Sequence, residues 1–343
     1  MTDTNKEAFS REALAPSRRD VFVGAALAAA AAPVAALAAT APGVGAEFAT
    51  DEFWAERGTV KLYIYRKRLA AGALQRPVLF LVHGSSISGR PSFDLATPGL
   101  GEYSLMNVFA RYGFDVWTMD FEGYGRSTVT PGNSDIKTGV LDLAAVMPIV
   151  KRETGQEKFH FWGESSGALR AAAFASAHPD QADRLILGAL TYTGKDSPTL
   201  EDRGKNLPFF RANSRRKRDL EMVRSIFTRD HPGTSDARLG DVLAAAELPH
   251  GDTVPTGTYL DMTANLPVVD PVKVKSPVLI IRGEYDGIAT IEDVSNFFDK
   301  LPNPDRQFVV LPGIAHSLQF AINRQLVYHA ANSFLKMPKA KMV

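Results

Sequence analysis

The chain has 343 residues, of which 45% are hydrophobic and 22% are charged, as in an ordinary globular protein. Its net charge of +1 gives no electrostatic reason to expect a nucleic-acid or membrane-surface partner. Cysteine is absent, which excludes disulfides, a cysteine nucleophile and a cysteine-ligated metal. The length suits one large domain with an insertion.

A pair of arginines followed by a long alanine-rich run marks the N-terminus. Ser17-Arg18-Arg19-Asp20 precedes the uncharged run 21–46, which offers small-residue cleavage sites at 36–38 and 39–41. This pattern resembles a twin-arginine export signal. A membrane anchor and a disordered tail are the alternatives, but Pro33 and the weak hydrophobicity of alanine disfavour a stable membrane span. We expect the twin-arginine export machinery to read residues 1–46, and the processed protein to be periplasmic or secreted.

From residue 58 onward the sequence alternates between strand and helix patterns. Strands are predicted at 59–69, 77–82, 114–119, 159–162, 185–190, 278–281 and 308–311. Helices are predicted at 103–111, 142–151, 168–177 and 318–334. Because strands and helices alternate, we expect an α/β fold with a mostly parallel twisted sheet and helices on both faces.

A long interval without a strand pattern separates the strand at 185–190 from the strand at 278–281. It contains several prolines, helical patches and many charges. A loop of that length without structure is improbable, so residues 195–270 are predicted to form an inserted helical cap over the site. The predicted division is an export signal and linker at 1–46, a core at 47–194 and 271–343, and the cap between its two parts.

The most informative motif is a serine between a predicted strand and a predicted helix. Residues 159–167 read FHFWGESSG, an apolar strand that runs into Gly-x-Ser-x-Gly, and an alanine-rich helix follows. In a nucleophile elbow the serine sits on a sharp, strained turn that lifts its hydroxyl into a cleft. Gly163 and Gly167 fit because side chains there would collide where strand and helix pack closely. Ser165 is therefore the candidate nucleophile, with a structural turn serine as the alternative.

A serine nucleophile needs a base, and the base needs an orienting acid. Asp286 and His316 each follow a predicted strand, at the carboxyl edge where sites on parallel sheets form. Glu284 and Asp196 are the alternative acids. His316 is preferred because it alone lies just after the last strand. The competing histidines are His83, His160, His178, His231, His250 and His329.

Two backbone N–H groups are candidates for an oxyanion hole. The segment His83-Gly84-Ser85-Ser86 follows the first long apolar strand, and Ser166 follows the candidate nucleophile. Acyl transfer develops a negative oxygen, which preorganised N–H groups stabilise. We therefore expect the N–H groups of Ser85 and Ser166 to bind that oxygen.

With these motifs in order, the chain resembles the α/β-hydrolase superfamily over roughly residues 58–335. The matching residues are His83-Gly84, the turn from Asp120 to Ser127, the GESSG elbow, Asp286 and His316. The order serine, aspartate, histidine is the one this fold uses. The resemblance implies an α/β-hydrolase fold. Two differences in these motifs argue against particular subgroups of the superfamily. The His-Gly-Ser-Ser segment differs from the His-Gly-Gly-Gly of hormone-sensitive-lipase-like esterases, and haloalkane dehalogenases and epoxide hydrolases use aspartate where this elbow has serine.

The motifs together predict a serine hydrolase that cleaves carboxylic esters without a cofactor or metal. Lactones, thioesters, amides and C–C bonds are alternative targets of the same triad, and a non-catalytic ligand-binding protein is the remote alternative. The expected partner is a small-molecule ester, and neither nucleic acid nor a membrane span is expected. Aromatic residues in the insertion favour a small or medium, partly aromatic ester. They are Phe209, Phe210, Phe227 and Tyr259.

Charged residues near the predicted site have two interpretations each. The cluster of Arg211, Arg215, Arg216, Lys217 and Arg218 is first interpreted as a solvated helix face. The sharper hypothesis is that one of these arginines reaches the pocket and binds a substrate carboxylate. Glu164, beside the nucleophile, is expected to tune the pocket or to form a salt bridge rather than to act as the base.

Overall fold

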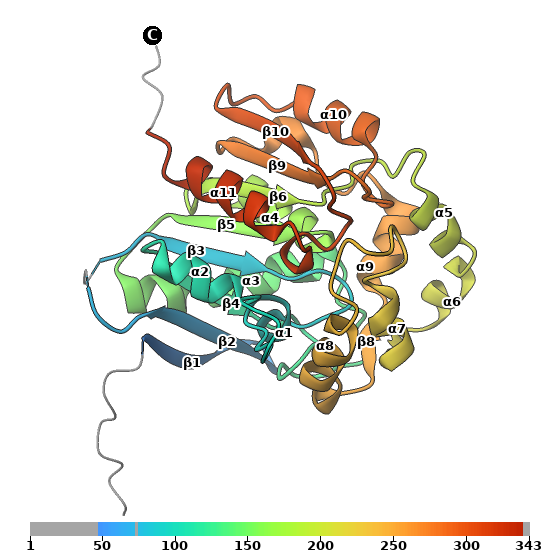
Figure 1. The fold of residues 1–343 in the computed structure, drawn as a ribbon, viewed down its shortest axis with the longest axis horizontal. Helices are drawn as coiled ribbons and strands as arrows, with labels where there is room; N and C mark the ends of the chain where they lie inside the picture. The colour runs from blue at the N-terminus through green and yellow to red at the C-terminus, as the bar shows by residue number, and fades with distance from the viewer. Residues whose placement is uncertain (1–46, 73–74, 339–343) are drawn as a thin grey trace, which may run out of the picture. The chain divides into compact units, whose positions relative to one another are not determined.

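The computed structural model describes residues 47–72 and 75–338, so the predicted export signal at 1–46 lies outside the described residues. Within them, eight strands form one sheet in the order β1-β2-β4-β3-β5-β6-β9-β10. Figure 1 shows helices on both faces of this sheet. The strands are β1 Phe48–Arg57, β2 Val60–Leu69, β3 Val78–Val82, β4 Asp115–Met119, β5 Phe159–Glu164, β6 Ala182–Gly188, β9 Val278–Gly283 and β10 Arg306–Leu311. The predicted α/β-hydrolase fold is confirmed.

The strand order places two candidate loops side by side. β1 and β2 form an antiparallel pair, β2 joins β4 antiparallel, and the remaining strands run parallel. β3 pairs with β4 on one side and with β5 on the other. Ligands of open α/β sheets bind beyond the carboxyl ends of strands at such a switch in order. The loop after β3 and the elbow after β5 both start there.

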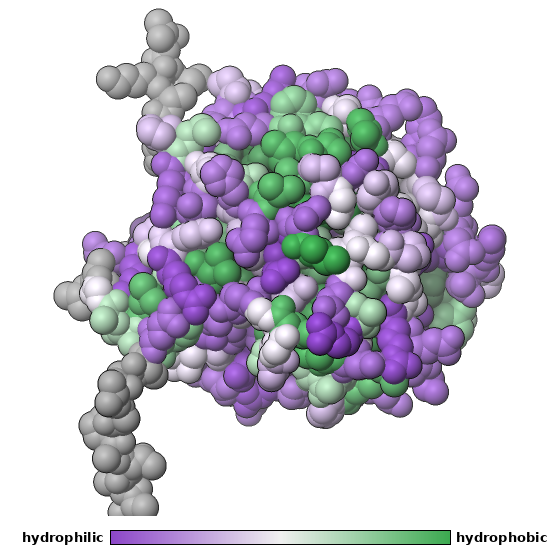
Figure 2. Space-filling model, viewed as in Figure 1, coloured by the Kyte–Doolittle hydropathy of each residue, from purple (hydrophilic) through white to green (hydrophobic). Residues whose placement is uncertain are grey.

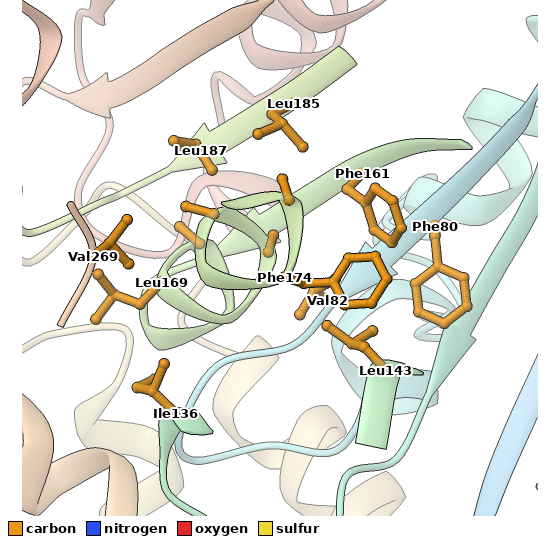
Figure 3. Packing of buried hydrophobic residues seen from close by; sticks show 14 of the residues in the cluster. Phe80, Val82, Ile136, Leu143, Phe161, Leu169, Phe174, Leu185, Leu187 and Val269 are labelled. Carbon is orange, nitrogen blue, oxygen red and sulfur yellow. The ribbon is translucent and has the colours of Figure 1, made fainter. Parts of the chain in front are cut away.

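Two hydrophobic clusters hold the helices against the sheet. The helices are α1 Gly89–Phe93, α2 Leu105–Arg111, α3 Ile136–Thr154, α4 Ser166–Ala177, α10 Ile291–Asp299 and α11 Arg324–Leu335. One cluster joins α3, α4 and α10 to one face, and the other joins α2 and α11 to the opposite face. Figure 3 shows side chains of β3, β5 and β6 gathered around α4, with Ile136 and Leu143 contributed by α3. α4, which follows the elbow, is therefore fixed by packing along its whole length.

The interval between β6 and β9 contains five short α-helices. They are α5 Pro198–Gly204, α6 Leu207–Ala212, α7 Leu220–Ser225, α8 Leu239–Glu247 and α9 Gly257–Leu260. They lie at the edge toward which the parallel strands point (Figure 1). A two-stranded antiparallel sheet of β7 Arg215–Lys217 and β8 Thr253–Pro255 lies among them. No sequence pattern predicts this sheet, because three basic residues and a strand ending in proline show no hydrophobic alternation.

The predicted helix at 318–334 is wrong over its first six residues. A short 3-10 turn at Leu318–Phe320 ends at Ala321, whose backbone is extended, and α11 begins only at Arg324. The N–H of Ile322 donates to the carbonyl of Thr234 at 2.8 Å, and Ala321 bridges to Ser235. Pairing with the interval between β6 and β9 therefore outweighs the local helix preference.

β1, α1 and α10 were not predicted from the sequence, and α3 begins six residues earlier than predicted. In β1 the adjacent apolar residues Phe53 and Trp54 break the period-2 alternation that marks a strand.

None of the helices in residues 47–72 and 75–338 combines the length and the hydrophobicity needed to cross a bilayer. On the face drawn in Figure 2, hydrophobic residues form separate patches among hydrophilic ones.

Candidate active site

Ser165 occupies a strained turn between β5 and α4. Its φ of 56° and ψ of −125° lie in a region where residues other than glycine are rarely found, and such a conformation costs about 1–3 kcal/mol. The Ser165 N–H donates to the carbonyl of Gly188 on the neighbouring strand at 2.9 Å. The turn is thus held by the sheet on one side and by the packed helix α4 on the other.

Two glycines allow strand and helix to approach this closely. A Cβ added to Gly163 would lie 2.2 Å from the carbonyl oxygen of Gly167. A Cβ on Gly167 would lie 2.1 Å from the carbonyl oxygen of Val82 in β3. Both distances are far inside van der Waals contact, so the predicted reason for glycine at these positions is confirmed.

The structure brings Ser165, Asp286 and His316 into one hydrogen-bonded chain. His316 Nε2 lies 2.9 Å from Ser165 Oγ, and His316 Nδ1 lies 2.8 Å from Asp286 Oδ1. An ionised carboxylate only accepts hydrogen bonds, so Nδ1 carries the imidazole proton and Nε2 accepts from the serine hydroxyl. Asp286 follows β9 and His316 follows β10, which pair in parallel and therefore present both loops at one edge of the sheet.

Asp286 is buried yet held in its ionised form. Burial raises the pKa of this carboxyl, but the hydrogen bond and the electrostatic interaction with His316 outweigh it, together with two backbone N–H groups. Those donors are Ile288 N at 2.9 Å and Ala289 N at 3.0 Å. The net direction is a pKa below the ordinary value, which suits an acid that orients and stabilises a histidine.

The alternative acids lie elsewhere. Glu284 accepts from the N–H of Gly313 at 2.8 Å, which ties the loop after β9 to the loop that carries His316. Asp196 is exposed and pairs with Lys195.

The competing histidine His83 is fully buried, and burial lowers its pKa to about 3, so it is neutral. Its Nδ1 donates to the carbonyl of Gly84 at 2.8 Å.

Ser85 and Ser166 lie next to one another beside the elbow. Ser85 Oγ donates to Ser166 Oγ at 2.8 Å, and the hydroxyl of Tyr124 donates to the Ser85 carbonyl at 3.0 Å. Within the described ranges, no hydrogen bond uses the backbone N–H of Ser85 or of Ser166. The first N–H groups of a helix have no partner within the helix, and Ser166 is the first residue of α4. Both donors are therefore available to an anionic oxygen near Ser165.

A cavity of about 80 Å³ opens at Ser165 and His316. Part of its lining comes from the interval between β6 and β9, namely Arg203, Ile226, Arg229 and Leu243. None of the four was predicted from the sequence, because no local pattern marks which residues of this interval reach a site distant in sequence. A substrate at Ser165 would thus contact both the sheet edge and this insertion.

Glu164 is a second buried carboxyl at the site. It lines the cavity, and its Oε1 has no hydrogen-bond partner among the described residues. Burial raises the pKa of Glu164 to about 8, the charge of Asp286 adds to this increase, and Gln319 opposes it. The expected salt bridge is absent from the described ion pairs, whereas the expected position in the pocket is observed. At neutral pH the two carboxyls differ, with Asp286 ionised and Glu164 protonated.

The raised pKa of Glu164 predicts a loss of stability in alkali. Between the unperturbed value of 4.5 and about 8, the folded chain retains a proton that the unfolded chain has released. Folding stability therefore falls as the pH rises through this window. Glu164→Gln keeps the shape and removes the titration, so its urea midpoint should fall less between pH 6 and pH 9 than that of the wild type. Equal pH slopes for the two proteins would contradict the assignment, and Glu284→Gln is the exposed control.

The predicted basic cluster does not form one solvated face. Arg218 is buried and pairs with Glu247, which corrects the first interpretation for that residue. Arg215 donates to the carbonyls of Gly123 and Thr253. Arg211 is exposed. Arg216 and Lys217 line a second chamber, whose other lining residues except Ser86 also come from the interval between β6 and β9.

No group of three or more histidine, aspartate or glutamate side chains in the described part of the chain could hold a metal ion.

Residues 98–322 match the family model described as "Serine aminopeptidase, S33".

The proteins similar to this chain include a lipase and two other hydrolases. Lipase 3 of Drosophila melanogaster is 28% identical over 133 residues, which is 35% of this chain and 33% of that protein. The 2-hydroxy-6-oxononadienedioate/2-hydroxy-6-oxononatrienedioate hydrolase of Paraburkholderia phymatum is 30% identical over 135 residues, 38% of this chain and 41% of that protein. The chain thus spans less than half the length of these relatives. E-2-(acetamidomethylene)succinate hydrolase superposes with a TM-score of 0.61 at 17% identity over 84% of this chain and 100% of that chain, a likeness of fold alone.

Proposed function

The chain belongs to the serine aminopeptidase S33 family of α/β hydrolases, and from its site we propose that it is a serine hydrolase that cleaves carboxylic esters of small to medium substrates. The observation that carries the proposal is the chain of hydrogen bonds from Ser165 Oγ through His316 to Asp286, at 2.9 and 2.8 Å. A serine in such a chain has a base within hydrogen-bonding distance, and the acid orients that base.

The proposed reaction begins with attack of Ser165 Oγ on the ester carbonyl. His316 Nε2 takes the hydroxyl proton, and Asp286 stabilises the imidazolium that forms. The backbone N–H groups of Ser85 and Ser166 bind the negative oxygen of the tetrahedral intermediate. Collapse of the intermediate breaks the bond to the alcohol, which leaves with the proton from His316.

The second half of the reaction frees the enzyme. His316 takes a proton from a water molecule, and the resulting hydroxide attacks the acyl group on Ser165. A second tetrahedral intermediate collapses, the carboxylic acid leaves, and the proton returns to Ser165 Oγ. Residues 195–270 act in this proposal as a cap that sets substrate size, because Arg203, Ile226, Arg229 and Leu243 line the cavity.

The test is reaction with a fluorophosphonate probe, followed by a substrate panel. An activated serine should be labelled at Ser165, and short-chain aryl esters should be hydrolysed faster than matched amides, lactones and thioesters. Labelling without ester hydrolysis would shift the proposal to another acyl substrate. Absence of labelling would overturn the serine-hydrolase proposal itself.

We also propose that residues 1–46 direct export through the twin-arginine machinery. The support is the pair Arg18-Arg19 ahead of an uncharged alanine-rich run. Replacing both arginines with lysines should leave the full-length chain in the cytoplasm, as measured by cell fractionation and intact mass. Unchanged processing of this variant would contradict the proposal.

A further inference from the structure

A second chamber adjoins the catalytic cavity inside the cap. Its volume is about 450 Å³. Ser86, Arg203, Ile226 and Arg229 line both spaces. These four residues therefore form a common boundary of the two spaces, and a substrate that reaches from Ser165 into the chamber would pass Arg203.

The chamber lining carries an excess of positive charge. Four cationic side chains line it, Arg203, Arg216, Lys217 and Arg229, against the single carboxylate of Asp202. Asp202 accepts from Lys205 at 2.9 Å, and Arg229 pairs with Asp230 at 3.0 Å.

Two of these arginines have no carboxylate partner in the described part of the chain, Arg203 and Arg216. Instead, each guanidinium lies over the ring of Tyr259, at 5.5 Å for Arg203 and 4.8 Å for Arg216. Contacts of this kind orient a guanidinium and leave its N–H donors unused. The ring of Phe210 lies 5.5 Å from that of Tyr259, so the walls beside the two cations are aromatic.

The environment of Arg203 disfavours its charge when the chamber holds no anion. Burial lowers the pKa of Arg203 to about 10, and the like charges of Arg229 and Arg216 act in the same direction. An anion between these side chains would offset both effects. A guanidinium binds a carboxylate through two parallel hydrogen bonds, which supplies geometry as well as charge.

Tyr259 also links the chamber to the loop beside the nucleophile. Its hydroxyl lies 2.7 Å from Ser86 Oγ, and Ser86 follows the proposed oxyanion residue Ser85. The two arginines are therefore positioned, through one aromatic ring, relative to the place where the ester carbonyl would react.

We propose that Arg203 and Arg216 bind a carboxylate of the substrate, so that the enzyme prefers esters carrying a carboxylate at the end distant from Ser165. This inference rests on the proposed ester hydrolysis and names its substrate class. The aromatic walls accept the hydrocarbon or aromatic part that separates the carboxylate from the ester.

The test compares p-nitrophenyl hemiesters of glutaric and adipic acid with p-nitrophenyl esters of monocarboxylic acids of matched length. The wild type should show the higher kcat/KM with the hemiesters. Arg203→Gln should lower the ratio of hemiester to neutral-ester kcat/KM by about ten- to a hundredfold, as expected for hydrogen bonds to a charged group. Arg216→Gln should change the ratio in the same direction, which keeps the test decisive if one variant fails to fold.

Arg211→Gln is the matched control, because Arg211 is an exposed cap arginine outside the chamber. It makes the same change of net charge and should leave the ratio unchanged. An equal effect of Arg211→Gln, or no preference for hemiesters in the wild type, would overturn the proposal.

Calorimetry separates failure of this inference from failure of the proposed function. The Ser165→Ala protein should bind the hemiester of adipic acid more tightly than the neutral ester, and added Arg203→Gln should remove the difference. This measurement needs no turnover, so it reports on the chamber even if the wild type hydrolyses neither ester. Equal binding of the two esters would refute the chamber's role.

Discussion

Ser165→Ala is expected to lower kcat for an aryl ester by about four to six orders of magnitude, the range found when a triad nucleophile is removed. Alanine lacks the hydroxyl that lies 2.9 Å from His316 Nε2, so no acyl-enzyme can form. Residual hydrolysis would come from substrate binding and from the N–H groups of Ser85 and Ser166 alone.

The loss should occur without unfolding. Alanine meets the same backbone strain at a φ of 56° as serine does, and the hydrogen bond from the N–H of residue 165 to Gly188 is preserved. Thermal unfolding of the variant should therefore match that of the wild type. Ser176→Ala is the matched control, because Ser176 lies on the same helix α4 and donates only to the carbonyl of Ala172. If Ser165→Ala kept a tenth or more of the activity, another group would be the nucleophile.

The residues of the site that could be predicted from the sequence are those that local sequence patterns mark. Ser165, Asp286 and His316 each follow an apolar strand within a few residues, and parallel strands end at one edge of the sheet. Local turn chemistry and strand order thus suffice to bring three residues together across intervals of 121 and 30 positions.

The cap contacts could not be predicted, because they depend on packing between segments that carry no shared pattern. The hydroxyl contact between Ser86 and Tyr259 joins residues 173 positions apart. Arg203 lies outside the basic run at 211–218, yet it lines the catalytic cavity. Within that run, charge and period do not distinguish the exposed Arg211 from the buried Arg218. Only the positions of their partners in the folded chain distinguish the exposed arginine from the buried one.

The buried ion pair of Arg218 and Glu247 fixes the cap to the loop beside the nucleophile. Arg218 is 1% exposed and Glu247 is fully buried. Glu247 also accepts from Ser88 Oγ at 2.6 Å and from Ser88 N at 3.2 Å. Arg218 in turn donates to the carbonyl of Ser86 at 3.1 Å. The pair therefore joins the end of α8 to Ser86 and Ser88 in the loop that follows β3.

Arg218→Ala is expected to lower the free energy of unfolding by about 3–5 kcal/mol, since it leaves the carboxylate of Glu247 buried without its counter-charge. Urea unfolding at pH 7 measures the loss. The double variant Arg218→Met/Glu247→Leu removes both charges and should recover most of it, because a buried pair replaced by apolar residues of similar volume is often neutral or stabilising.

Arg224→Ala is the matched control, because Arg224 pairs with Asp241 on the exposed surface of the same cap and exposed pairs contribute little. Its urea midpoint should stay close to that of the wild type. A loss for Arg218→Ala no larger than for this control would show that Glu247 finds water or another partner when Arg218 is removed. A loss that the double variant does not recover would instead assign the stability to the hydrogen bonds at Ser86 and Ser88, which position the loop that carries Ser85.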